Sequence, residues 1–160
     1  MLVYDRIEAA LNACEEHLKA LRAADIESTE IERYLVAGLV VFIVSEYEEF
    51  LEQSFRGRAD RCGDLHAANF IKVSISQKFR SPDLNKINET LRRFDKSYFD
   101  IFSAEIENSK PHAAWDSIMK ARHAVVHKQG LLNLTFRELR EKYTDSKKVV
   151  ENVRRALGLA

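Results

Sequence analysis

Apolar residues at the start of the chain recur at alternating spacings of three and four, and no other feature restricts the fold as strongly. They are Tyr4, Ile7, Leu11, Cys14, Leu18 and Leu21. Because an α-helix completes a turn in about 3.6 residues, this spacing places them on one face and predicts an amphipathic helix over residues 3–24. Five glycines and two prolines in 160 residues argue against turn-rich β-structure. We therefore expect an all-α fold.

Capping patterns indicate where two further helices begin. Thr29 followed by Glu32, and Thr135 followed by Glu138, have the form of a capping box. In such a box each side chain bonds the backbone amide of the other residue. The first pattern predicts a long helix that ends near residue 58 and is very apolar in its first half. The second predicts the last helix of the chain.

The prolines indicate two more starts. Ser81 has the position of an N-cap with Pro82 in the first helical turn, and Pro111 opens the next helix in the same way. We expect the helix from Pro111 to end near Gly130, because glycine favours the left-handed conformation found just after helices. The segment from Pro82 to residue 102 is predicted to be one bent helix or two.

The segment around residues 65–75 fits two patterns. Ile71, Val73 and Ile75 alternate with polar residues as they would in a strand. We interpret the segment as a helix. The expected architecture is then a bundle of five to seven helices that forms a single domain over residues 1–160.

Charge and cysteine content narrow the class of protein. The 25 basic and 25 acidic residues cancel, so any site for a polyanion must be local. Two cysteines do not make a disulfide framework. The longest apolar stretch, residues 35–44, is shorter than the about 20 residues that a membrane span needs, and the N-terminus does not resemble a secretory signal. We expect a cytoplasmic protein without a cofactor or metal.

The helix that follows Pro111 carries an arginine where an apolar residue would fit the pattern. At about 100° per residue, four apolar side chains share one face of this helix. They are Trp115, Ile118, Met119 and Val126. Arg122 falls in the middle of that face, and His123 and His127 lie together at its edge. A guanidinium stays charged, so it must reach solvent, pair with a carboxylate, or face a surface that a ligand or second chain completes.

Carboxylates interrupt the apolar face of the long second helix in a similar way. Glu46 and Glu49 fall on that face, whereas Glu48 and Glu52 are predicted to turn toward solvent. Because an unpaired buried charge is strongly unfavourable, we expect Arg122 to pair with Glu46 or Glu49 where the two helices pack. The alternative is a purely structural ion pair, since such pairs are common in proteins without an active site.

The run from Trp115 to Gly130 resembles the signature helix of the HEPN superfamily, with the RiboL-PSP subgroup as the best match. That signature is an arginine, a polar residue, small apolar residues, and then a histidine with a glycine soon after. Arg122, His123 and His127 occupy the corresponding positions. The family more often has asparagine where this chain has His123. The resemblance in architecture extends over most of the chain, and the resemblance in motif over about its last third.

The resemblance implies a metal-independent ribonuclease whose site forms between two copies of the chain, each contributing its motif helix. Arg122 would hold the scissile phosphate, and His127 would transfer a proton while the 2′-hydroxyl of the RNA attacks. Lys120, His123 and Lys128 would add positive charge for the RNA backbone. The expected partners are RNA, a second copy and, for a toxin or phage-defence effector, an antitoxin or other partner protein.

Other interpretations stay open at this point. His123 and His127 have the spacing by which a helix presents two ligands to a metal ion. A non-catalytic HEPN-like module could bind RNA or dimerise beside a partner protein, and a leucine-rich bundle could have no role with nucleic acid. The spacing of Arg122 and His127 is not specific by itself, because Arg61 and His66 have the same spacing, with Gly63 between them.

Overall fold

The computed structural model describes residues 3–27, 29–76, 80–127 and 132–159. Its helices are α1 (Val3–Ala23), α2 (Thr29–Ala59), the 3-10 helix η1 (Asp60–Cys62), α3 (Leu65–Ser76), α4 (Leu84–Phe94), α5 (Lys96–Ile106), α6 (Lys110–Val126) and α7 (Phe136–Ala156). Within these ranges there is no β-strand. The prediction of an all-α bundle is confirmed, and so is the interpretation of residues 65–75 as a helix.

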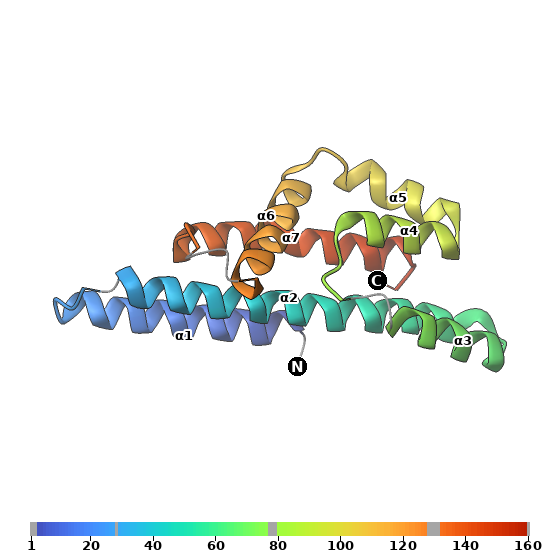
Figure 1. The fold of residues 1–160 in the computed structure, drawn as a ribbon. Helices are drawn as coiled ribbons and strands as arrows, with labels where there is room; N and C mark the ends of the chain where they lie inside the picture. The colour runs from blue at the N-terminus through green and yellow to red at the C-terminus, as the bar shows by residue number, and fades with distance from the viewer. Residues whose placement is uncertain (1–2, 28, 77–79, 128–131, 160) are drawn as a thin grey trace.

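Helices α1, α3, α6 and α7 pack on α2, the longest helix (Figure 1). Helix α1 runs back along one side of α2, α7 lies along another, and α3 folds back at its C-terminal end. Helices α4 and α5 form a hairpin that packs on α7 through α5, while α6 crosses α7 and reaches α2. Each α-helix contributes to one hydrophobic core. Its members include Leu11, Val40, Ile75, Leu91, Phe102, Trp115 and Val150.

The predicted apolar stripe of α1 is confirmed as the face that packs in the core. Its buried members are Ile7, Leu11, Cys14 and Leu18. Beside this face, Arg140 of α7 donates a hydrogen bond to Asn12 Oδ1 at 2.9 Å. Fully burying one such aliphatic side chain contributes about 1.5–3 kcal/mol, so the stripe holds α1 in place far more than this exposed hydrogen bond does.

Of the two predicted capping boxes, only the second has the expected bonds. The Thr135 N–H donates to Glu138 Oε2 at 2.8 Å, and Thr135 Oγ1 accepts from the Glu138 N–H at 3.2 Å. Thr29 is itself the first residue of α2. The Glu32 carboxylate instead pairs with Arg22 at 3.3 Å and accepts the Phe136 N–H at 2.9 Å. Glu32 therefore connects α1 and α2 to the start of α7.

Two aspartates set the limits of α4 and α5. Asp83 is the N-cap of α4 and accepts from the Lys86 N–H at 2.8 Å, so the prediction that Ser81 is the cap is wrong. Ser81 has a positive φ of 51°, a conformation that does not lead into a right-handed helix. Asp95 has an extended backbone (φ −166°, ψ 138°) and caps α5 through the Ser97 N–H. The predicted segment from residue 82 to 102 is therefore two helices.

The acidic residues of α2 are not divided between core and solvent as predicted. Glu46 is buried, but Glu49 is exposed. Glu48 is half-buried and its Oε1 accepts from the Ser81 N–H at 2.6 Å. The reason is that α1, α3, α6 and α7 all pack on α2, so its core-facing surface is wider than one stripe.

Neither α2 nor any other helix in the described ranges is long and apolar enough to cross a bilayer.

Candidate functional site

Helix α6 is anchored in the core by the only tryptophan of the chain. The Trp115 side chain is fully buried and its ring stacks on that of Tyr47, with centroids 4.9 Å apart and planes inclined by 15°. Its Nε1–H donates to the Pro82 carbonyl at 3.0 Å. Tyr47 in turn shares a hydrogen bond of 2.8 Å with Ser146 of α7. These contacts fix the direction in which the rest of α6 points.

The C-terminal half of α6 lies at the margin of the core. The buried residues of the helix are Ala114, Trp115 and Ile118, and none follows Ile118. Arg122 is half-buried, and Val126, on the same face, is 46% exposed. The apolar face predicted from the sequence is thus fully covered only at its beginning. Its end, which carries the arginine, is only partly covered.

His123 and His127 lie side by side where α6 ends. Their ring centroids are 4.3 Å apart and their planes are inclined by 48°. Both side chains are exposed. The His127 N–H donates to the His123 carbonyl at 3.0 Å, which makes His127 the C-cap of α6. The predicted helix end near Gly130 and the predicted RNA contact Lys128 lie outside the described residues.

Helical geometry separates the candidate residues into two groups. Lys120, His123 and His127 are spaced by three and four, so they share one face of α6. Arg122 and His127 are five residues apart, which places them about 140° from each other around the helix axis. One copy of α6 therefore brings the two imidazoles and Lys120 together, but it does not bring Arg122 to the same side.

The carboxylates predicted to pair with Arg122 face a different arginine. Arg6 of α1 places Nη2 3.1 Å from Glu46 Oε1, and Nη1 4.0 Å from Glu49 Oε2. The predicted pairing is wrong, and Arg122 forms no ion pair with a carboxylate in the described part of the chain. A helical wheel shows that Glu46 faces inward, but it does not show which helix covers it. Arg6 was missed because it sits on the polar side of the first stripe.

The structure bears on two alternatives, a metal site and the second Arg–His pair at Arg61 and His66. Across the described ranges, no three His, Cys, Asp or Glu side chains are placed to hold a metal ion together. Arg61 lies in η1 and donates to the Gly158 carbonyl at 2.8 Å, whereas His66 lies in α3. Gly63 separates them with a φ of 78°. These two residues are thus not parts of one helix.

The fold and the open, basic end of α6 define an all-helical bundle with a candidate site for a polyanion. The chain matches the family model RiboL-PSP-HEPN over residues 5–158. It therefore belongs to the RiboL-PSP-HEPN family, as the resemblance of its α6 segment predicted. HEPN domains are often ribonucleases, and membership suggests an RNase-like or RNA-binding function. No curated protein matches the chain, and no solved structure does.

Proposed function

We propose that the protein is a metal-independent endoribonuclease whose active site is formed by the α6 helices of two copies. One observation carries the proposal. Arg122 is a half-buried cation on an apolar helix face, and it has no carboxylate partner among the residues that the structure describes. A half-buried guanidinium without a carboxylate partner suits a phosphate group, and the family suggests that the phosphate belongs to RNA.

Arg122 and His127 have complementary parts in the proposed reaction. The Arg122 guanidinium donates paired hydrogen bonds to the scissile phosphate and stabilises the extra negative charge of the transition state. His127 transfers the proton, taking it from the 2′-hydroxyl or giving it to the leaving 5′-oxygen. The 2′-oxygen forms a bond to phosphorus as the bond to the 5′-oxygen breaks. The products are a 2′,3′-cyclic phosphate and a 5′-hydroxyl.

The placement of these residues favours a site shared by two copies. Arg122 and His127 of one chain point about 140° apart around α6, so a single helix does not present both to one phosphate. Val126 lies beside Arg122 and leaves an apolar side chain in solvent. We propose that a second copy covers this face, with Arg122 of one chain and His127 of the other reaching the same phosphate. Lys120, His123 and Lys128 then flank the RNA backbone.

The proposed setting is the cytoplasm, where the protein acts as a toxin or phage-defence effector that a partner protein restrains. The neighbouring gene tests this role. A gene for an antitoxin-like protein beside this one supports the toxin role, and a restriction or helicase cluster supports phage defence. A conserved position among RNA-processing genes would contradict both.

Cleavage of a 5′-labelled single-stranded RNA in EDTA tests the activity itself. The wild-type protein should cut it, and Arg122→Ala or His127→Ala should abolish cutting while the circular dichroism spectrum stays unchanged. Arg33→Ala and His17→Ala, which remove exposed residues of the same types elsewhere, should cut normally. Cleavage that survives both motif substitutions refutes the assignment, and cleavage lost on chelation points to a metal site. RNA binding without cleavage would assign a non-catalytic module instead.

A further inference from the structure

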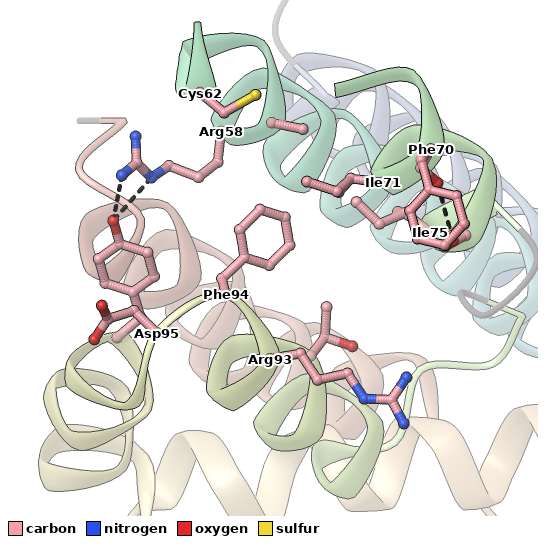
Figure 2. Close-up of a pocket in the computed structure, with 12 residues that line it drawn as sticks. Arg58, Cys62, Phe70, Ile71, Ile75, Arg93, Phe94 and Asp95 are labelled. Carbon is pink, nitrogen blue, oxygen red and sulfur yellow. Dashed lines mark hydrogen bonds between the residues drawn. The ribbon is translucent and has the colours of Figure 1, made fainter. Parts of the chain in front are cut away.

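A cavity of about 560 Å³ opens between α3 and the corner where α4 meets α5 (Figure 2). Its described lining residues come from the end of α2, from η1 and from α3, α4 and α5, and none of them belongs to α6. The cavity is therefore distinct from the candidate active site. Sites for small molecules usually span about 300–1,000 Å³. This one has room for a nucleotide, and its walls indicate which chemistry it accepts.

Aromatic rings form much of the wall. Phe70 of α3 is 75% exposed, and Phe94, at the end of α4, points into the gap (Figure 2). Arg58 holds the ring of Tyr98 in position, since its Nε donates to the Tyr98 hydroxyl at 2.9 Å and its guanidinium carbon lies 5.3 Å from the ring centroid. Bases of unpaired nucleic acid stack on aromatic rings and on guanidinium planes. A flat ligand would also remove the Phe70 side chain from water.

The polar groups of the cavity include several hydrogen-bond acceptors beside the donating guanidinium groups of Arg58 and Arg93. The hydroxyl of Thr90 donates its hydrogen to the Lys86 carbonyl at 2.7 Å, and that of Ser74 donates to the Phe70 carbonyl at 2.9 Å. Both oxygens therefore offer only lone pairs to a ligand. Asp95 adds a carboxylate, which accepts and does not donate when ionised, although its Oδ1 already accepts the Ser97 N–H that caps α5. This set of acceptors suits a base whose edge carries an amino group, as guanine, adenine and cytosine have and uracil does not.

Arginines supply positive charge at the same cavity. Arg58 and Arg93 both line it, against a single lining carboxylate, Asp95, among the described residues. Arg93 pairs with Glu89 one turn away on the exposed surface. Such exposed pairs contribute little, so Arg93 can exchange this partner for a phosphate. We propose that the cavity binds a nucleobase that carries an amino group, with the attached phosphate at Arg93.

The base can come from single-stranded RNA or from a free nucleotide, because the two share this chemistry. Only the choice of RNA rests on the proposed function, since binding in the cavity requires neither Arg122 nor His127. The test is calorimetric titration of the full chain with GMP, UMP and ribose 5-phosphate. GMP should bind about tenfold more tightly than ribose 5-phosphate, the gain expected from stacking one base, and more tightly than UMP. A short single-stranded oligonucleotide that binds more tightly than GMP identifies RNA as the source. Equal affinity identifies the free nucleotide.

A pair of substitutions on α3 locates the binding. Phe70→Ala should weaken GMP binding about tenfold. Leu65→Ala removes a side chain that is 70% exposed on the same helix but does not line the cavity, and it should bind GMP as the wild type does. The proposal is overturned if ribose 5-phosphate binds as tightly as GMP, or if Phe70→Ala leaves the affinity unchanged. GMP binding by a protein that never cuts RNA would uphold the cavity and refute the ribonuclease. RNA cleavage by a protein whose GMP binding does not depend on Phe70 would uphold the ribonuclease and refute the cavity.

Discussion

The guanidinium of Arg6 on α1 lies 3.1 Å from the carboxylate of Glu46, a residue of α2 that is only 3% exposed. The second carboxylate oxygen of Glu46 is buried and accepts no hydrogen bond from the described residues. The charge of Glu46 is therefore balanced chiefly by Arg6. This pair belongs to the packing of α1 on α2, and it leaves Arg122 available for another anion.

Replacing Arg6 with alanine should lower the free energy of unfolding by about 1–3 kcal/mol, because it leaves a buried carboxylate without its partner. Glu46→Gln combined with Arg6→Ala should recover part of that loss, since the buried group is then neutral. Urea unfolding of the two single variants and the double variant measures this coupling. RNA cleavage should remain at the wild-type level in Arg6→Ala, and a loss of cleavage in a folded variant would return Glu46 to the active site.

Tyr47→Phe should destabilise the protein by about 1 kcal/mol, because the buried hydrogen bond to Ser146 is lost while the ring and its stacking on Trp115 remain. Thermal unfolding followed by circular dichroism gives the change in Tm. Tyr34→Phe is the matched control, since Tyr34 is 63% exposed and the variant should unfold as the wild type does. Equal Tm values for all three proteins would mean that the contact between α2 and α7 does not depend on this hydroxyl.

Val126→Glu should convert a dimer to monomers and reduce RNA cleavage at least tenfold. It places a charge in the apolar part of the proposed interface, where like charges of the two copies would also meet. Ile101→Glu changes a residue of α5 that has the same 46% exposure, and it should leave both properties intact. Light scattering coupled to gel filtration measures the mass. A wild-type protein that is monomeric and fully active would exclude the shared site.

Glu138→Gln should change how stability depends on acid. Hydrogen bonds from the backbone and side chain of Thr135 hold the pKa of the Glu138 carboxyl below its ordinary value of 4.5. A folded pKa below the unfolded one stabilises the fold above about pH 4.5, and this contribution disappears as the pH falls through the folded pKa. Wild type should therefore exceed Glu138→Gln in Tm at pH 7, with the gap narrowing as the pH falls below about 4.5. A gap that is constant across this range would contradict the assignment. Glu141→Gln, an exposed carboxyl on the same helix, provides the comparison.

Periodicity and capping chemistry predicted the helices well because both depend on residues close in sequence. The stripe of Leu11 and Leu18 on α1 and the capping box of Thr135 are local patterns, and the structure contains both. The prediction that Ser81 caps α4 also rests on a local pattern, and it is wrong. Ser81 and Asp83 can both cap a helix by their chemistry. The fold in which Asp83 is the cap also contains the hydrogen bond from Trp115 to the Pro82 carbonyl.

Contacts between distant segments were not predictable in the same way. A wheel for α2 shows that Glu46 is on a buried face, but the choice between Arg6 and Arg122 as its partner depends on which helix lies there. The cavity has the same origin, since Phe70 and Phe94 come from helices that meet only in the folded chain. For α6, the sequence located Arg122 on an apolar face, and only the crossing of α6 over α7 shows that this part of the face is partly covered.

The burial of Trp115 has a practical consequence for spectroscopy. As the only tryptophan of the chain, it supplies nearly all of the indole fluorescence, and its environment is the ring of Tyr47 and the carbonyl of Pro82. Its emission should shift to longer wavelength when α6 separates from α2. Because Trp115 does not line the cavity beside α3 and lies two helical turns before Arg122, ligands at either place should leave that emission nearly unchanged. The chain thus carries an intrinsic optical signal that separates unfolding from ligand binding.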